Sequence, residues 1–172
     1  MAAVFVAHLP AGYIASKLVY RRCDPLEIPY PEFMLAGMAG ALAPDLDLAW
    51  LYLVDHGARH HHTYFTHYPI FWLSLLAVAF AWHREADRKG PAALWCIFAL
   101  NGFIHQCLDS VVGDIQWFAP FSGEFCALAK VPAVHKPWWL NFLLHWSMLL
   151  EAAIVIWALV LWRRRPRFAL RG

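Results

Sequence analysis

The sequence predicts an all-α membrane protein, a bundle of about five membrane helices that forms a single domain over residues 1–172. Three observations predict it: 61% of the residues are hydrophobic, only 15% are charged, and the mean hydropathy is +0.46. A soluble domain of this length cannot bury so much apolar surface, because too little of a small protein is interior. Lipid is therefore the expected solvent for most of the chain.

Five apolar segments account for the predicted helices, and they cover residues 3–19, 34–54, 68–82, 92–108 and 140–162. A helix needs about 20 apolar residues to cross a bilayer. The second and fifth segments reach this length, whereas the others are short and require a tilted or dipping end. Pro10 and Gly12 weaken the helix in the first segment, which is either a full span or a half-buried, re-entrant helix.

Positive charge predicts how these segments are threaded. Eleven of the fourteen Lys and Arg residues lie in three clusters, within residues 17–22, 84–89 and 163–171. Cytoplasmic loops collect Lys and Arg, so the N-terminus is expected outside and the C-terminus in the cytoplasm, after five crossings. The first segment is not expected to be a signal peptide, because its positive charges follow the apolar run instead of preceding it.

This threading, which takes no account of histidine, gathers nine of the ten histidines at the outer end, and His83 is the exception. Two aspartates, Asp45 and Asp47, lie in the outer half of the second segment. A charged group in a membrane helix costs about 2.5–3.5 kcal/mol on insertion scales. Pro44 predicts a broken helix, in which both carboxylates can face one centre. In the alternative, Asp45 caps the restarting helix and Asp47 reaches the interface.

Further polar side chains fall at the same end. His105 and Asp109 are four residues apart and share a helix face, which suits either a common metal ion or a local hydrogen bond. His62 and His67 flank Thr66 in the outer loop, and the adjacent His60, His61 and His62 cannot all face one point. The choice between His61 and His62 stays open.

Other residues carry weaker signals. His8 and His145 each lie alone in a helix, and Glu151 lies deep in the fifth segment, where a carboxylate needs a partner and can support a ligand histidine. A solvated position is expected for Asp114, Glu124 and His135 in the outer connection.

Imidazoles and carboxylates without paired thiolates indicate a site for one or two divalent metal ions, zinc, manganese or iron, of which zinc and manganese are favoured. The four cysteines form no CxxC pair, which argues against a thiolate site or a disulfide framework. A metal ion makes a nucleophile of bound water, and Asp109 or Asp47 would accept its proton. The predicted ligands are His8, Asp45, Asp47, His62, His67, His105 and Asp109.

The order H…PDLD…HxxxxH…HxxLD…PF over residues 8–121 resembles the YdjM-like family of bacterial inner-membrane proteins, which are grouped as metal-dependent hydrolases. The matching residues are His8, Asp45, Asp47, His62, Thr66, His67, His105, Asp109, Pro120 and Phe121. The resemblance implies a hydrolase embedded in the inner membrane, with metal bound by these His and Asp residues. The family's His-Arg-Gly-x-Thr-His pattern reads HTYFTH here, so a phosphate-binding role for that Arg does not carry over.

The functional prediction is a membrane-bound metal-dependent hydrolase whose site faces the outer interface. Its expected partners are membrane lipid and an ester or phosphoester substrate, with no nucleic acid, because basic residues do not line a polar groove. The alternative is a metal-binding or transport protein without hydrolysis. Transport requires ionisable residues through the membrane, and after Glu151 the fifth segment has none before Arg163. A purely structural membrane protein would leave Asp45 and Asp47 unexplained.

Overall fold

The computed structural model describes residues 6–23, 28–137 and 139–164. Residues 3–5 of the first predicted segment and the basic residues after 164 lie outside the described residues. Five long helices make the body of the protein: α1 (His8–Cys23), α2 (Tyr30–Leu42), α4 (Pro69–Glu85), α5 (Lys89–Asp109) and α7 (Ser147–Arg163). Short elements connect them: η2 (Pro44–Leu46), α3 (Asp47–Leu53), η3 (His61–Thr63), η4 (Phe65–His67) and α6 (Trp139–Leu143).

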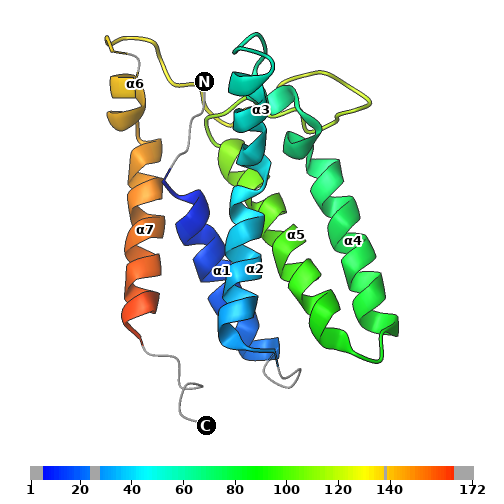
Figure 1. Cartoon of the computed structure of the whole chain (residues 1–172). Helices are drawn as coiled ribbons and strands as arrows, with labels where there is room; N and C mark the ends of the chain where they lie inside the picture. The colour runs from blue at the N-terminus through cyan, green and yellow to red at the C-terminus, as the bar shows by residue number, and fades with distance from the viewer. Residues whose placement is uncertain (1–5, 24–27, 138, 165–172) are drawn as a thin grey trace.

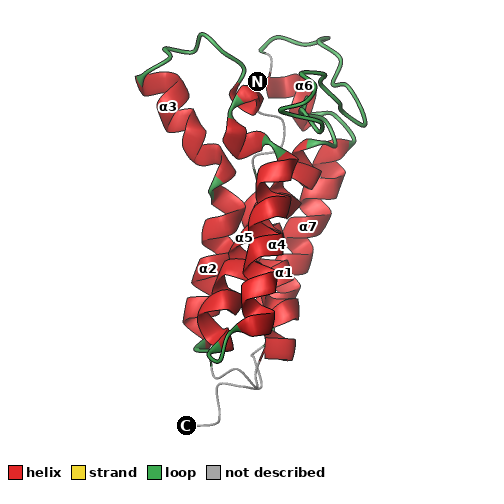
Figure 2. Cartoon of the chain, turned by 90° about the vertical axis from the view of Figure 1, so that its right-hand side faces the viewer, coloured by secondary structure: helices red, strands yellow, loops and turns green. Residues whose placement is uncertain are grey.

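The five long helices lie side by side and alternate in direction (Figure 1). Helices α1, α4 and α7 run away from the end of the bundle that carries α3, and α2 and α5 run back towards it. The turned view shows the same elongated bundle, with α3 and the long connection before α6 at one end (Figure 2). We call this the α3 end. The alternation agrees with the predicted threading.

Helix α1 lies at the centre of the bundle, in contact with α2, α5 and α7. Pro10 does not interrupt it, because Pro10 lies in the first turn, where a backbone N–H has no acceptor within the helix. Gly12 lets α2 approach closely, since a Cβ there would lie 2.5 Å from the Ala41 Cβ. Both residues therefore serve a continuous, packed helix, and the expected weakness of the first segment is not seen from His8 onward.

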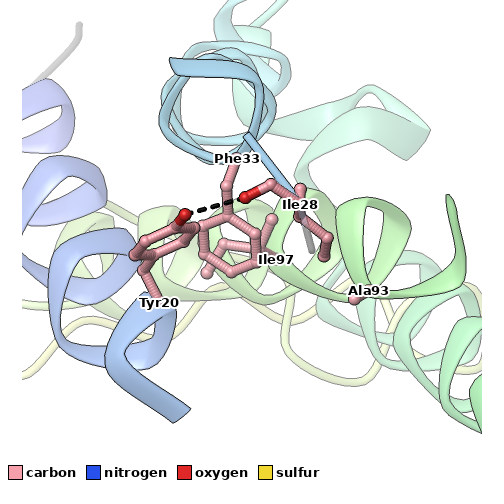
Figure 3. Close-up of a cluster of buried hydrophobic side chains, with 5 residues drawn as sticks. All are labelled: Tyr20, Ile28, Phe33, Ala93 and Ile97. Carbon is pink, nitrogen blue, oxygen red and sulfur yellow. Dashed lines mark hydrogen bonds between the residues drawn. The ribbon is translucent and has the colours of Figure 1, made fainter. Parts of the chain in front are cut away.

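The opposite end of the bundle has its own apolar core. Tyr20 of α1, Phe33 of α2, and Ala93 and Ile97 of α5 pack around Ile28, and the Tyr20 hydroxyl donates a 2.7 Å hydrogen bond to the Ile28 carbonyl (Figure 3). This cluster fixes α1, α2 and α5 against one another. At the α3 end α1 and α5 carry polar side chains and α2 offers the Ala41 carbonyl, so the relative rotation of these helices there is set by this packing.

Lys17 also contributes at this end. Its sequence position suggested a cytoplasmic linker, but α1 continues past it and its side chain is buried. The ammonium donates hydrogen bonds to the carbonyls of Leu161 and Arg164 at the end of α7. A cation at these last carbonyls satisfies acceptors that the helix leaves open and favours the helix dipole.

Two predicted segments are broken. The break at Pro44 was predicted and is confirmed, because α2 ends at Leu42 and α3 starts at Asp47. The fifth segment was predicted as continuous over 140–162, which is wrong, since α6 ends at Leu143 and α7 starts at Ser147. His145 Nδ1 lies 3.0 Å from the Ser147 hydroxyl and 3.4 Å from its backbone nitrogen, and such local bonds compete with helical ones.

The outward faces of the helices are apolar. Exposed side chains include Leu35 of α2, Val78 and Phe80 of α4, and Leu149 and Ile156 of α7. By its own length and composition, α5 is the one described helix that could cross a membrane. Helices α1, α4 and α7 have 16 or 17 residues, which corresponds to about 24–26 Å at 1.5 Å per residue.

Candidate metal centre

Six histidine and aspartate side chains from distant parts of the chain meet at the α3 end. They come from the first turn of α1, from η2, η3 and η4, and from the end of α5: His8, Asp45, His62, His67, His105 and Asp109. The structure thus brings together six of the seven ligands predicted from sequence. Five of the six are at most 4% exposed, whereas the Asp45 side chain is 33% exposed.

Asp109 lies at the centre of this group. Its Oδ1 is 3.1 Å from His8 Nε2, and its Oδ2 is 3.0 Å from His105 Nε2. The same Oδ2 lies 3.7 Å from the Nε2 atoms of both His62 and His67. One carboxylate therefore faces four imidazoles from three parts of the chain.

Asp45 completes the group from the side of α2. Its Oδ1 is 3.6 Å from His105 Nε2 and 3.8 Å from His67 Nε2. The break at Pro44 places it there, because a continuous helix would carry Asp45 along the axis of α2 and away from the turns that hold His67. His8 fits beside it, with its ring stacked on that of His105 at 3.8 Å between centroids.

The Nδ1 atoms of two histidines are held by backbone carbonyls. His62 Nδ1 is 2.8 Å from the Asp114 oxygen, and His105 Nδ1 is 2.8 Å from the Ala41 oxygen. A carbonyl can only accept, so each ring carries a proton on Nδ1, and Nε2, which faces the centre, is the nitrogen that could bind a metal ion. This is the tautomer that a metal ion requires, held as metal-binding histidines usually are.

Asp47 holds His67 in the same way, from the Nδ1 side of its ring. Its Oδ2 is 2.6 Å from His67 Nδ1 and accepts a 2.7 Å hydrogen bond from the Thr66 hydroxyl. Asp45 and Asp47 therefore face opposite nitrogens of the His67 ring, instead of one centre. Two residues apart, at the junction of η2 and α3, they point in different directions. Asp47 is a positioning residue, and its hydrogen bond leaves His67 Nε2 free to face Asp109.

The inward-facing atoms fit a metal ion. Nε2 of His62, His67 and His105 and Oδ2 of Asp109 are buried and have no hydrogen-bond partner among the described residues. A buried polar atom left in that state costs about 1–3 kcal/mol, which a cation would offset. Zinc bonds of about 2.0–2.1 Å put tetrahedral ligands about 3.3 Å apart, and the distances around Asp109 and Asp45 run from 3.0 to 3.8 Å.

His61, which the sequence left as an alternative to His62, is also buried here, with 4% exposure. Its ring centroid lies 4.0 Å from that of His62 and 5.1 Å from that of His67. Burial lowers the pKa of His61 to about 2 and that of His62 to about 4, because desolvation disfavours the charged imidazolium. Both rings are therefore neutral near pH 7, as ligands must be.

Glu151 supports the group from α7. It is buried, and its Oε2 accepts a 3.2 Å hydrogen bond from the Val6 backbone nitrogen, two residues before His8. The carboxylate thus holds the start of α1, instead of a ligand ring as the sequence suggested. His145 bonds Ser147 and is not among the grouped donors of the described residues.

The outer connection, described over residues 110–137, folds back over the α3 end. The side chains of Asp114, Glu124 and His135 are exposed there, as expected. Backbone bonds from Leu128 to Ser110 and from Ala129 to Val111 fold it against the end of α5. This fold delivers the Asp114 carbonyl to His62.

Together these features define an all-helical protein with a buried group of histidines and aspartates that could hold a metal ion. The chain belongs to the YdjM family of inner membrane proteins, whose family model matches residues 3–169. No curated protein and no solved structure gives a significant match. Its family therefore makes it an inner membrane protein, as the resemblance predicted, and leaves its activity to be inferred from the site.

Proposed function

We propose that the protein is a multi-pass metal-dependent hydrolase of the inner membrane that cleaves an ester or phosphoester of a lipid at the outer interface. One observation carries the proposal: three imidazole Nε2 atoms and the Asp109 Oδ2 converge in a buried site without hydrogen-bond partners among the described residues. Neutral imidazoles with carboxylates suit zinc or manganese.

The multi-pass topology is supported by the outward faces of the bundle. Exposed apolar side chains on α2, α4 and α7 would need a partner in water, and lipid supplies one. The end of α4 and the start of α5 lie opposite the α3 end (Figure 1), and they carry the basic residues Arg84, Arg88 and Lys89. Positive charge marks the cytoplasmic side, so the site is proposed to face outward, at the depth of the headgroups.

Different residues of the site are proposed to have different roles in hydrolysis. A bound divalent cation lowers the pKa of its water towards about 7 and so supplies a nucleophile at neutral pH. His67 and His105, oriented by Asp47 and by the Ala41 carbonyl, would hold the cation. Asp45 is the carboxylate that solvent reaches, so we assign the proton acceptor to Asp45 in preference to the buried Asp109 and Asp47.

A lipid substrate is supported by an apolar groove between α1, α2 and α7. The groove has a volume of about 240 Å³ and is lined by Leu9 and Tyr13 of α1, Met38 of α2, and Val155 and Leu159 of α7. Leu9, at the α3 end of the groove, directly follows His8 in the chain. We propose that an acyl chain lies in it while the headgroup ester reaches Asp45.

Transport of the cation is less well supported by the polar side chains between the site and the opposite end of the bundle. The next polar side chains into the bundle are Asn101, which donates a 3.0 Å hydrogen bond to Ser16, and then Lys17. A cation that left the site would meet a neutral pair and then an ammonium group, which repels it.

The test uses the full chain, purified in detergent and loaded with zinc or manganese. We expect turnover of a generic phosphodiester, a carboxylic ester or a phospholipid that chelator abolishes. His67→Ala and Asp109→Ala should lose most of the metal, whereas His135→Ala, an exposed histidine at the same end, should keep it. Asp45→Asn should lose roughly 10²–10⁴-fold in rate. Bound metal without chelator-sensitive turnover on any of these substrates would favour the non-hydrolytic alternative.

The groove has its own test. Leu159→Trp should fill it and lower turnover of long-chain phospholipid, while a soluble phosphodiester is cleaved as before. Leu149→Trp, which places the same bulk on an exposed part of α7 outside the groove, is the matched control. Equal loss with both variants, or with both substrates, would contradict an acyl chain in this groove.

A further inference from the structure

The site offers more donors than one cation uses. A tetrahedral zinc ion takes four ligands, and the described residues form three overlapping groups whose ligand atoms lie within 4.8 Å of one another. Two of these groups share no residue. One consists of His8, Asp45 and His105, and the other of His61, His62 and His67.

The third group joins the two. It takes His105 from the first group, His67 from the second, and adds Asp109. Asp109 contacts both groups: its Oδ1 lies 3.1 Å from His8 Nε2, and its Oδ2 lies 3.0 Å from His105 Nε2 and 3.7 Å from the Nε2 atoms of His62 and His67. A carboxylate in this position can bridge two cations.

A zinc ion takes four ligands. A single ion therefore cannot be bound by all of the residues in these groups. If His67 serves an ion together with His61 and His62, then His8, Asp45 and His105 still form a complete set of three. Each set supplies three terminal ligands, and Asp109 supplies a shared fourth. In this arrangement His61 is a ligand of the second ion, which explains why it is buried in η3 beside His62.

We propose that the site holds two divalent cations, one bound by His8, Asp45 and His105, the other by His61, His62 and His67, with Asp109 as the bridging carboxylate. This inference rests on the proposed metal centre and makes His61 a ligand. Paired cations about 3.5–4 Å apart stabilise both the attacking and the leaving oxygen of a displacement at phosphorus. The substrate class that follows is a phosphoester, in preference to a carboxylic ester.

The test is metal stoichiometry, measured on the purified full chain after equilibration with zinc and removal of unbound ion. We expect about two zinc ions per wild-type chain, as a two-metal site requires. Each set of three is then weakened separately. His61→Ala and His8→Ala should each leave about one ion, and the double variant should leave close to none, whereas His135→Ala should keep both. His61→Gln, far-UV circular dichroism and gel filtration check that a loss of metal is not a loss of fold.

A second readout is independent of counting. With manganese in place of zinc, two ions bridged by Asp109 are spin-coupled, and the electron paramagnetic resonance spectrum should change to that of an isolated ion in His61→Ala. One zinc per wild-type chain, or two zinc ions retained by His61→Ala, would overturn the two-cation proposal alone. No bound metal in the wild-type chain would overturn the proposed function with it.

Discussion

Asp47 tests most directly whether the orientation of His67 matters to the site. Its carboxylate accepts two hydrogen bonds, at 2.6 Å from His67 Nδ1 and at 2.7 Å from the Thr66 hydroxyl. Asp47→Asn can keep both bonds through its amide oxygen but loses the charge, whereas Asp47→Ala loses both. Removal of such supporting partners costs about 10–100-fold in metal affinity. We expect a loss near tenfold for Asn and near 100-fold for Ala, or about 1.4 and 2.8 kcal/mol.

The assay is competition for zinc against a coloured chelator, with the full chain in detergent. Asp114→Asn is the matched control, because it removes a carboxylate at the same end whose side chain is exposed, while its backbone carbonyl still binds His62. Wild-type affinity in both Asp47 variants would refute the positioning role. Equal losses in Asp47→Asn and Asp114→Asn would show that only overall charge matters.

Three further predictions concern packing, helix ends and the ion itself. A Cβ at Gly113 would lie 3.0 Å from His62 Cε1 and 2.8 Å from the Asp109 backbone oxygen, so Gly113→Ala should weaken zinc binding in the same competition assay. Gly123→Ala is the control and should not weaken it, because the nearest neighbour of a Cβ there lies at 3.6 Å. Unchanged affinity in both variants would show that the site tolerates this crowding. Lys17→Met should lower the free energy of unfolding by about 1–3 kcal/mol, because buried carbonyls of α7 lose a charged donor, and denaturation would measure this; a parallel loss of metal would contradict a role confined to the helix ends. Removal of metal by chelator should lower the thermal midpoint, since a ligand at 100 times its Kd stabilises the folded state by about 2.7 kcal/mol; an identical midpoint with and without zinc would mean that the folded chain does not bind it.

Much of the fold follows from sequence. Three of the five predicted segments each correspond to one helix, the second is broken at Pro44 as predicted, and the histidines gather at one end as the basic clusters suggested. These features are local or depend on the direction of the chain along the bundle. The fifth segment shows the limit, because its apolar run is continuous while the structure breaks it where His145 bonds Ser147.

The sequence predicted which residue types lie at the site but not how their atoms are arranged. Residue types and their order along the chain determined that imidazoles and carboxylates meet at one end, because alternating helices return every second loop to that end. Which atoms face one another is decided by the tertiary structure alone. Asp45 Oδ1 faces His105 Nε2, Asp47 Oδ2 contacts Nδ1 of His67, and the ring of His61 lies beside that of His62. The rotation of each helix about its axis and the path of each turn depend on packing between distant segments, such as Tyr20 and Phe33 against Ile97. Spacing within any one segment does not contain that information.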